Sequence, residues 1–340
     1  MNFVGGGRNT AAGGSASREK RDPRPSEKLP DTHTEQRKTA LKYEESFVDK
    51  NFIVTGATGA IGSAVAKKLL GAGATVALFA RDADKLENLV RDPACRMGKY
   101  FAVCHNFKED PKILERKVRE SIEKLKGKLD GLICCHGTFK AGTLKDTTIK
   151  DWDVITNVNV RTFIMMTSLC VPFLKMTKGN AVILTSTAGE VPTPGALAFC
   201  VSKSMVNMMI ECAALELAYF GVRVNGVAAG MTQSNTLMRP ESLGLSQVQN
   251  DAFLKKQAGF VPLLNKLNEP EDVADSILWV ASEEASFLTG EIITVDGAQS
   301  LTSNQYMEFE KEMFRGKVVA GPPGAEQQPD KRGTYLTSLR

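Results

Sequence analysis

The sequence predicts an α/β domain in which a parallel sheet is covered by helices on both faces. Short apolar runs rich in β-branched residues recur from about residue 50 onward, and amphipathic stretches of helical length separate them. The runs are nearly all apolar and do not alternate with polar residues. Such strands are buried on both faces, and strands that alternate with helices pair in parallel. A doubly wound sheet of this kind binds its ligands at the carboxyl ends of the strands.

Strands and helices follow one another in a regular order. Seven runs are predicted strands: NFIVTG (51–56), TVALFA (75–80), KYFAVC (99–104), DGLICC (130–135), NAVILTS (180–186), VRVNGVA (222–228) and EIITVDG (291–297). The clearest helices between them are GSAVAKKLLGAG (62–73), PKILERKVRESIEKLKG (111–127) and EDVADSILWVASEEA (271–285). No internal repeat is visible, so one domain over residues 46–303 is expected.

Two polar tails flank this domain. Residues 1–45 carry mixed charges with scattered glycine and proline, and they cannot bury enough apolar surface to fold alone. In the C-terminal extension, 304–340, the stretch NQYMEFEKEMFRGK (304–317) predicts a short charged helix, and a flexible tail follows it. Both tails are near neutral overall. They are either inert solvated ends or extensions that become ordered on contact with a partner.

Composition excludes several classes of function. The net charge of +4 is spread along the chain, which argues against a nucleic-acid-binding surface. The longest apolar stretch, TFIMMTSLCVPFL (162–174), contains polar residues and is broken by Pro172. It falls short of the roughly 20 residues needed to span a bilayer, so no membrane span is expected.

The cysteines and histidines point to a reducing compartment. The seven cysteines form no CxxC pair and lie mostly in apolar segments, so buried reduced thiols are expected. The three histidines are not clustered, which disfavours a metal site. Residues 1–18 lack acidic groups, as a mitochondrial transit peptide would, but they are glycine-rich and have no amphipathic stripe. We therefore expect a cytoplasmic protein, with a mitochondrial location as the alternative.

A glycine-rich turn follows the first predicted strand. Gly56, Gly59 and Gly62 form G-x-x-G-x-x-G between a strand and an amphipathic helix. Glycine at these positions permits a tight turn and the close approach of a pyrophosphate to the helix N-terminus. This context predicts a dinucleotide site to which Thr58 and Ile61 also contribute. A glycine-rich turn without a ligand is the alternative.

Arg81 ends the second predicted strand. An acidic residue there would bind the ribose 2′-hydroxyl of NAD, and none is present. Arg81 can instead hold a 2′-phosphate, which favours NADP over NAD as the cofactor. A solvated arginine is the alternative.

Five separated segments share the order and spacing of a known family: TNVNVRTF (156–163), VILTSTAG (182–189), FCVSK (199–203), VRVNGVAAGMTQS (222–234) and EPEDVADSILWVASEEASFLTGEIITVDGAQS (269–300). Over about residues 50–300 the chain resembles the classical short-chain dehydrogenases/reductases. The resemblance implies a Rossmann-type domain with a seven-stranded parallel sheet, a nicotinamide dinucleotide cofactor and assembly into dimers or tetramers.

The resemblance also implies catalytic residues. The family's asparagine, which supports a water beside the lysine, matches Asn159. Its substrate-orienting serine matches Ser186, and its lysine, which binds the nicotinamide ribose, matches Lys203. Its proton-donating tyrosine matches Phe199, which has no proton to give. Cys200 is a poor substitute because it points about 100° away from position 199 on a helix, and Ser202 is not expected to replace the phenol either.

Further positions depart from the family's pattern. Its adenine-contacting aspartate matches Asn106, with His105 as the other alignment, and its Asn-Asn-Ala-Gly is CCHG (134–137). The resemblance implies that Gly137, at the end of CCHG, and Gly230 and Thr232, after the sixth strand, bind the cofactor. Three further changes are Ala60 for a glycine, Ala229 for a proline and Ser234 for a threonine.

These changes leave three functional alternatives. The leading one is an impaired relative that binds NADP(H) and serves as a structural or sensing subunit, because loss of a general acid costs about 10²–10⁴ in rate. The second is an active carbonyl or enoyl reductase that uses a water bound to Lys203 or another acid. The third is a domain whose cofactor pocket is closed by His136.

Two segments bear on partners and substrate. In the helix that carries Lys203, a core role is predicted for Met205, Met208, Met209 and Cys212, and the resemblance implies an oligomer interface around residues 199–219. Residues 235–266 resemble a mobile substrate loop. Its apolar residues Leu237, Met238 and Phe253 favour a lipophilic substrate.

Overall fold

The computed structural model describes residues 42–233 and 246–302. Predictions for the two tails, for the charged helix at 304–317 and for Ser234, Leu237 and Met238 lie outside these ranges. Within them, the chain from Lys42 onward forms one compact unit.

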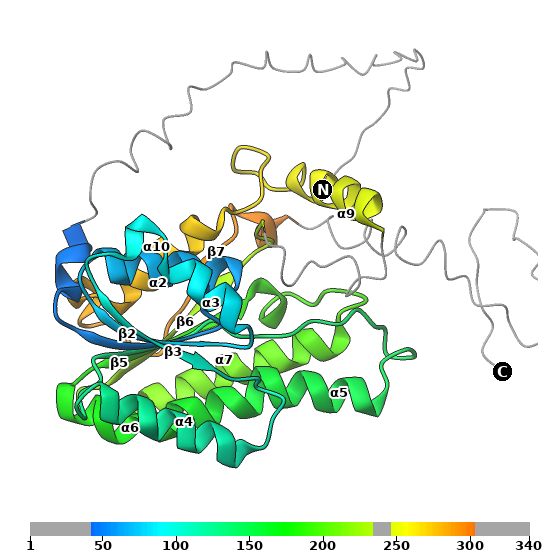
Figure 1. Ribbon diagram of the computed structural model, residues 1–340. Coiled ribbons are helices and arrows are strands. Elements are labelled where there is room, and N and C mark those ends of the chain that lie inside the picture. Colours follow the sequence, from blue (N-terminus) through cyan, green and yellow to red (C-terminus); the bar gives the residue numbers. More distant parts are fainter. Residues whose placement is uncertain (1–41, 234–245, 303–340) are drawn as a thin grey trace, which may run out of the picture. The chain divides into compact units, whose positions relative to one another are not determined.

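Seven strands form one parallel sheet (Figure 1). They are β1 (Asn51–Thr55), β2 (Thr75–Ala80), β3 (Lys99–Cys104), β4 (Gly131–Cys134), β5 (Asn180–Ser186), β6 (Arg223–Ala229) and β7 (Ile292–Val295). Their spatial order is β3-β2-β1-β4-β5-β6-β7, and every neighbouring pair is parallel. The predicted α/β class and all seven predicted strands are confirmed.

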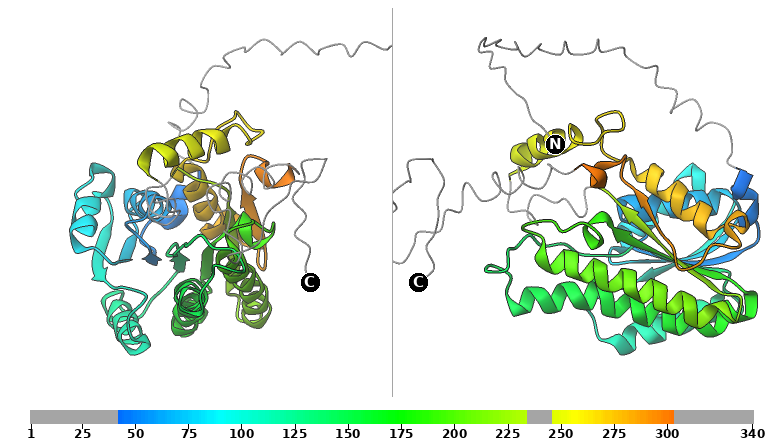
Figure 2. Two further views of the ribbon diagram at one scale, coloured as in Figure 1. Left: turned by 90° about the vertical axis from the view of Figure 1, so that its right-hand side faces the viewer. Right: turned by 180° about the vertical axis from the view of Figure 1, so that it is seen from behind.

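Helices cover both faces of the sheet, as Figures 1 and 2 show. One face carries α2 (Ala60–Gly71), α3 (Ala83–Val90) and α10 (Pro270–Ala281). The other carries α4 (Pro111–Lys124), α6 (Thr162–Thr177) and α7 (Leu197–Ala218). Because side chains alternate along a strand, β1 contributes Phe52 and Val54 to the first core and Ile53 to the second. Burial on both faces explains why the strands are apolar throughout.

A long helical segment runs from Ile149 to Thr177. It joins α5 (Ile149–Thr156), the π-helical turn η3 (Asn157–Arg161) and α6. The sequence-based expectation that Pro172 breaks this stretch is wrong, because α6 continues through it. By length and composition, both this segment and α7 are long and apolar enough to cross a membrane. Half of the apolar window of each is buried against the rest of the domain, as in core helices.

Short elements complete the described chain. They are η1 (Lys42–Phe47), η2 (Pro93–Cys95), η4 (Thr187–Gly189), α9 (Gln247–Ala258), η5 (Glu283–Ala285) and η6 (Gln299–Leu301). The described part of the chain begins with η1 at Lys42, four residues before the predicted boundary, and the buried ring of Phe47 packs edge-on against Phe52 at 5.6 Å. Part of the predicted substrate loop is helical, since α9 contains Phe253.

Candidate active site

The glycine loop between β1 and α2 is shaped for close backbone contact. Gly56 has a φ of +66°, which only glycine adopts freely. A Cβ on Gly56 would lie 2.7 Å from the backbone of Cys135, and one on Gly62 would lie 2.2 Å from the carbonyl oxygen of Gly56. Gly59 precedes α2 without any side-chain cap. The first backbone N–H groups of α2 are therefore available to an anion.

A cavity of about 90 Å³ lies beside this loop. It is bordered by the segments that follow β1, β2, β3 and β4, which is where a doubly wound sheet binds a nucleotide. Its lining residues are Gly56, Thr58, Gly59, Ala80, Arg81, Asn106, Phe107, Lys108, Cys135, His136, Thr138 and Val158. Five of the predicted cofactor-binding residues are therefore brought together: Gly56, Thr58, Gly59, Arg81 and Asn106.

The structure favours Asn106 over His105 as the residue that faces the nucleotide. Asn106 borders the cavity, whereas His105 is buried, with its Nδ1 3.3 Å from a carboxylate oxygen of Glu109. Burial lowers the pKa of His105, which therefore stays neutral to a lower pH than an exposed histidine.

His136 is held within the fold by both ring nitrogens. Thr162 Oγ1 donates its proton to the Val158 carbonyl, so it accepts from His136 Nε2 at 2.7 Å. Nδ1 then accepts from Thr55 Oγ1, also at 2.7 Å. The ring stacks on Phe107 at 3.8 Å between centroids, and burial lowers the pKa of His136 well below its usual value. His136 is thus a neutral structural group that forms one wall of the cavity.

Asn159 connects the loop after β4 to α7. Its Oδ1 accepts from the Thr138 N–H at 2.8 Å, and its Nδ2 donates to the Thr138 carbonyl at 2.9 Å and to Ser202 Oγ at 3.1 Å. The side chain is fully buried. Its amide is therefore occupied in positioning two segments of the site.

Ser186 lies at the carboxyl end of β5. Its Oγ accepts from the Ala188 N–H at 3.2 Å and so caps η4. In the described part of the chain its hydroxyl proton is donated to no acceptor. Ser186 can therefore still donate a hydrogen bond to a substrate carbonyl.

Lys203 is a buried cation with one hydrogen bond. Its Nζ donates to the Leu184 carbonyl of β5 at 2.9 Å, and only 4% of the residue is exposed. The rings of Phe163 and Phe199 lie 5.4 and 5.7 Å from Nζ. Burial lowers the pKa of Lys203 to about 8. Within the described structure the other two ammonium protons have no hydrogen-bond acceptor.

Phe199 is buried beside this lysine and packs edge-on against Phe139 at 5.2 Å. No tyrosine of the described residues lies in the segments around Phe199. Tyr43 lies in η1 before β1, Tyr100 lies near the start of β3, and Tyr219 follows α7, about 30 Å along the helix from position 199. The strand-end edge of the sheet therefore lacks a phenol donor among the residues that the structure describes.

Cys200 and Ser202, which follow Phe199 on α7, already donate their side-chain protons to backbone carbonyls. Burial raises the pKa of the Cys200 thiol, which donates to the Thr193 carbonyl at 3.7 Å. Ser202 Oγ donates to the Phe199 carbonyl at 2.7 Å.

Known proteins resemble this chain in sequence and in fold. Residues 56–298 match the family described as enoyl-(acyl carrier protein) reductase. The 3-oxoacyl-(acyl-carrier-protein) reductase FabG of Thermotoga maritima is 30% identical over 246 residues, which cover 72% of this chain and 95% of that protein. Dehydrogenase/reductase SDR family member 4 of Sus scrofa is 30% identical over 265 residues, covering 76% and 90%. The chain belongs to the short-chain dehydrogenase/reductase family.

A solved short-chain type dehydrogenase/reductase from Mycobacterium marinum has the same fold. Its TM-score is 0.68 at 24% identity, and the match covers 76% of this chain and 98% of that one. Membership in the short-chain dehydrogenase/reductase family makes this chain one of the NAD(P)-dependent oxidoreductases. The glycine cradle and the uncapped start of α2 fit such a dinucleotide.

Six predicted cofactor-binding residues of this short-chain dehydrogenase/reductase lie outside the cavity lining: Ile61, Gly62, Gly137, Lys203, Gly230 and Thr232. Ile61 is part of the core beneath α2. A Cβ on Gly137 would meet only Asn159, at an ordinary 3.6 Å, whereas one on Gly230 would lie 2.5 Å from Asp296. Thr232 is buried and donates to the Gly230 carbonyl at 3.0 Å. Packing accounts for Ile61, Gly230 and Thr232 without a ligand, and their cofactor roles stay predictions.

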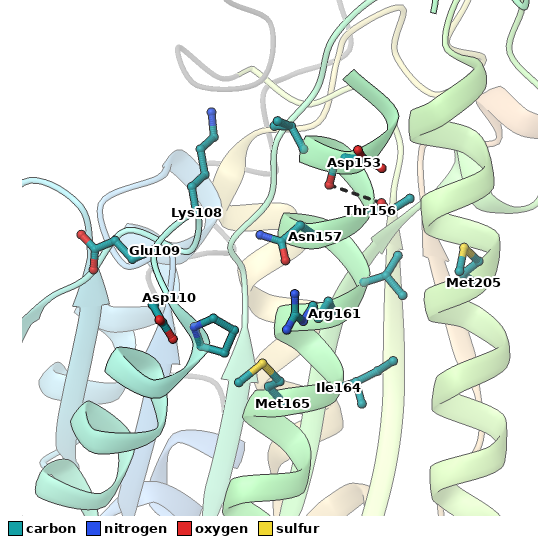
Figure 3. Close-up of a pocket in the computed structure, with 13 residues that line it drawn as sticks. Lys108, Glu109, Asp110, Asp153, Thr156, Asn157, Arg161, Ile164, Met165 and Met205 are labelled. Atoms are coloured by element: carbon teal, nitrogen blue, oxygen red, sulfur yellow. Dashed lines mark hydrogen bonds between the residues drawn. The ribbon is translucent and has the colours of Figure 1, made fainter. Parts of the chain in front are cut away.

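A larger hollow of about 840 Å³ lies beside the nucleotide cavity and was not expected from the sequence. Figure 3 shows its walls: the segment around Lys108 and Asp110 on one side, and the helix with Asn157 and Arg161 on the other. Met205 of α7 also borders it. The hollow is a groove along the helical face of the domain.

Sequence reasoning missed Phe107, Lys108 and Phe139. Phe107 and Lys108 directly follow Asn106, so their position just past a parallel strand was an available signal. For Phe139 there was none, because its partner Phe199 is 60 residues away and only the fold brings them together.

Proposed function

We propose that this protein binds NADP(H), is impaired in hydride transfer to carbonyls, and serves as a structural or sensing subunit of an assembly. The observation that carries the proposal is the environment of Phe199. An apolar ring packed on Phe139 occupies the position where the family places its general acid. No phenol among the described residues lies near it.

The preference for NADP(H) rests on Arg81. It borders the nucleotide cavity, and its side chain is exposed. The neighbouring Asp82 caps α3 by accepting from the Lys85 N–H at 3.1 Å and does not line the cavity. A cation without a competing carboxylate suits a 2′-phosphate better than a free 2′-hydroxyl.

The retained residues would still organise a substrate. A bound nicotinamide supplies hydride. The Ser186 hydroxyl is free to donate to a carbonyl oxygen, and Lys203 places a positive charge behind it. A proton must also reach the oxygen that hydride attack leaves negative, and Phe199 cannot deliver it. We therefore expect the protein still to bind the cofactor and to orient a substrate carbonyl, although the proton-transfer step is lost.

Nucleotide binding is the first test. Purified protein is titrated with NADPH and with NADH, and binding is followed by nucleotide fluorescence and by thermal shift. We expect micromolar affinity for NADPH and weaker binding of NADH. Absence of binding by both nucleotides at millimolar concentration would overturn the proposal.

Restoring the phenol tests the proposed impairment. We expect Phe199→Tyr to raise the rate of NADPH oxidation with a reactive dicarbonyl by about 10²–10⁴-fold, since that is the usual contribution of a positioned general acid. The control is Phe199→Leu, which opens the same position without supplying a proton and should give no gain. Wild-type turnover equal to that of the tyrosine variant would contradict impairment.

A second candidate function is an active NADP(H)-dependent reductase of a lipophilic carbonyl or enoyl substrate. Two unused donors favour it: the Ser186 hydroxyl proton and the two ammonium protons of Lys203 that have no acceptor in the described structure. A water held by Lys203 would then supply the proton. A screen of keto-acyl, steroid and quinone-like carbonyls with the wild-type protein separates this function from the first.

Assembly is proposed through the exposed sides of α6 and α7. The predicted core role is wrong for Met205, Met208 and Cys212, which are exposed, whereas the partly buried Met209 packs against the core. Ile164 and Leu215 extend the same apolar surface. Apolar residues gathered on one helical face are typical of a protein interface, and a second copy of this chain is the proposed partner.

A further inference from the structure

Lys108 borders the nucleotide cavity together with Arg81. The two residues come from different segments: Arg81 follows β2, and Lys108 follows β3, which is the neighbour of β2 in the sheet. Both side chains are exposed. In the part of the chain that the structure describes, neither forms an ion pair.

The backbone around Lys108 is held in place. The Lys108 N–H donates to Asn106 Oδ1 at 3.2 Å, and the Glu109 N–H donates to the Asn106 carbonyl at 2.9 Å, which closes a tight turn. Between them, the Phe107 ring stacks on His136 with an interplanar angle of 5°. Because His136 is itself anchored at both nitrogens, the turn presents Lys108 from a fixed position.

The acidic neighbours of Lys108 are occupied elsewhere. Glu109 lies 3.3 Å from His105 and 4.0 Å from Lys117, and Asp110 caps α4 by accepting from the Lys112 N–H at 2.8 Å. In Figure 3 the Lys108 side chain extends away from both carboxylates. Its charge is therefore available to a ligand.

We infer that Lys108 and Arg81 together bind the 2′-phosphate of NADP(H), so that Lys108 is a specificity-determining residue of the nucleotide site. The inference rests on the proposed use of NADP(H). A phosphate dianion offers three acceptor oxygens and is bound best by more than one cationic donor. Arg81 supplies a planar guanidinium, and Lys108 supplies a more mobile point charge.

Lys108 also borders the larger hollow, where Asp153 lines the opposite wall. In the competing assignment, the charge of Lys108 acts on ligands of that groove and not on the nucleotide. The two assignments differ in one property. Only a nucleotide role makes the effect of Lys108 depend on a phosphate at the 2′ position.

The experiment compares two nucleotide fragments that differ in that phosphate alone. Adenosine 2′,5′-bisphosphate and AMP are titrated calorimetrically into the full-length protein and its variants, so that no turnover is needed. We expect Lys108→Ala to weaken binding of the bisphosphate about tenfold and to leave AMP within about twofold, as for loss of one charge-assisted contact. Lys108→Arg should retain most of the affinity. The matched control, Lys112→Ala, removes an exposed lysine four residues away that borders neither cavity.

Each outcome decides the inference. The inference is supported if Lys108→Ala loses affinity for the bisphosphate and not for AMP. This difference between wild type and variant should shrink when salt is added, because the site is exposed and its charges are screened. If Arg81→Ala abolishes the preference and Lys108→Ala does not change it, the inference is overturned and the proposed NADP(H) preference stands. If the wild-type protein binds both fragments equally, both are overturned. Thermal unfolding of each variant without nucleotide confirms that its fold is intact.

Discussion

Lys203 carries a buried charge beside the phenyl ring of Phe199. The residue is 4% exposed, and its ammonium group donates to one carbonyl and is flanked by two phenyl rings. A buried cation with so few polar partners is costly, and its lowered pKa expresses that cost. A fold under selection for stability alone would have little reason to keep it. Its presence here supports a role in binding the cofactor.

The buried charge makes a prediction about alkaline pH. The pKa of Lys203 is about 8 in the folded protein and 10.5 unperturbed. Between these values the unfolded chain binds a proton that the folded one does not, so this group should increase stability by about 3 kcal/mol as pH rises through the window. Urea unfolding of the wild type and of Lys203→Met from pH 7.5 to 10.5 measures the difference. Parallel pH profiles would contradict the prediction, and Lys112→Met, at an exposed lysine, should behave as the wild type.

Among the elements, the joint between β1, β4 and α6 depends on one histidine. The His136 ring bonds Thr55 at the end of β1 and Thr162 at the start of α6, and it stacks on Phe107 after β3. Four elements are thereby held together at the edge of the sheet where the nucleotide cavity lies. The ring must be neutral to accept a proton from Thr55 and donate one to Thr162.

Acid should loosen this joint. The pKa of His136 lies well below its usual 6.5, so the folded chain keeps it neutral while the unfolded chain takes up a proton. Stability is therefore lost as pH falls below 6.5, by about 1 kcal/mol per pH unit for this residue. We expect the unfolding free energy of the wild type to fall more steeply between pH 6.5 and 5 than that of His136→Gln. Equal slopes would show that His136 is not the group responsible.

The elements differ in how far the sequence predicts them. Strands were predictable because burial on both faces makes them apolar runs, and the glycine turn was predictable because Gly56 and Gly62 meet backbone at short distance. The continuation of α6 through Pro172 was not, because surrounding packing compensates for a lost hydrogen bond. Nor were the partners of His136, which lie 81 and 26 residues away in sequence.

At the scale of the whole molecule, the most informative surface is the side of α7 that faces away from the sheet. Met208 is 59% exposed and Leu215 is 84% exposed, although helical spacing alone predicted burial for the methionine. Helical spacing of apolar residues predicts that one face of a helix is buried, but it does not identify the element or the chain that packs against that face. In the proposed oligomer, a second copy of the chain covers this face.

A charge placed on this face should therefore dissociate the proposed oligomer. We expect the wild-type protein to sediment as a dimer or larger species and Met208→Glu to shift it toward the monomer, because a carboxylate would be buried without a partner. Analytical ultracentrifugation measures the shift. Met97→Glu is the matched control, since Met97 is exposed but lies outside this helical face. A monomeric wild-type protein would exclude this interface.

The π-helical turn at Asn157–Arg161 also matters for how the gene can change. The Thr162 N–H bonds the Asn157 carbonyl, five residues back, so this turn holds one residue more than an α-helical turn. Deleting a single codon here would restore α-helical bonding and leave a continuous helix. Because the turn holds the extra residue within itself, α5 and α6 would keep nearly their present orientation, but the residues of the turn would point in new directions, and Asn159 would lose its position beside Thr138. One small deletion would thus preserve the helix and dismantle the site, which makes this turn a marker for whether a relative has kept its active-site geometry.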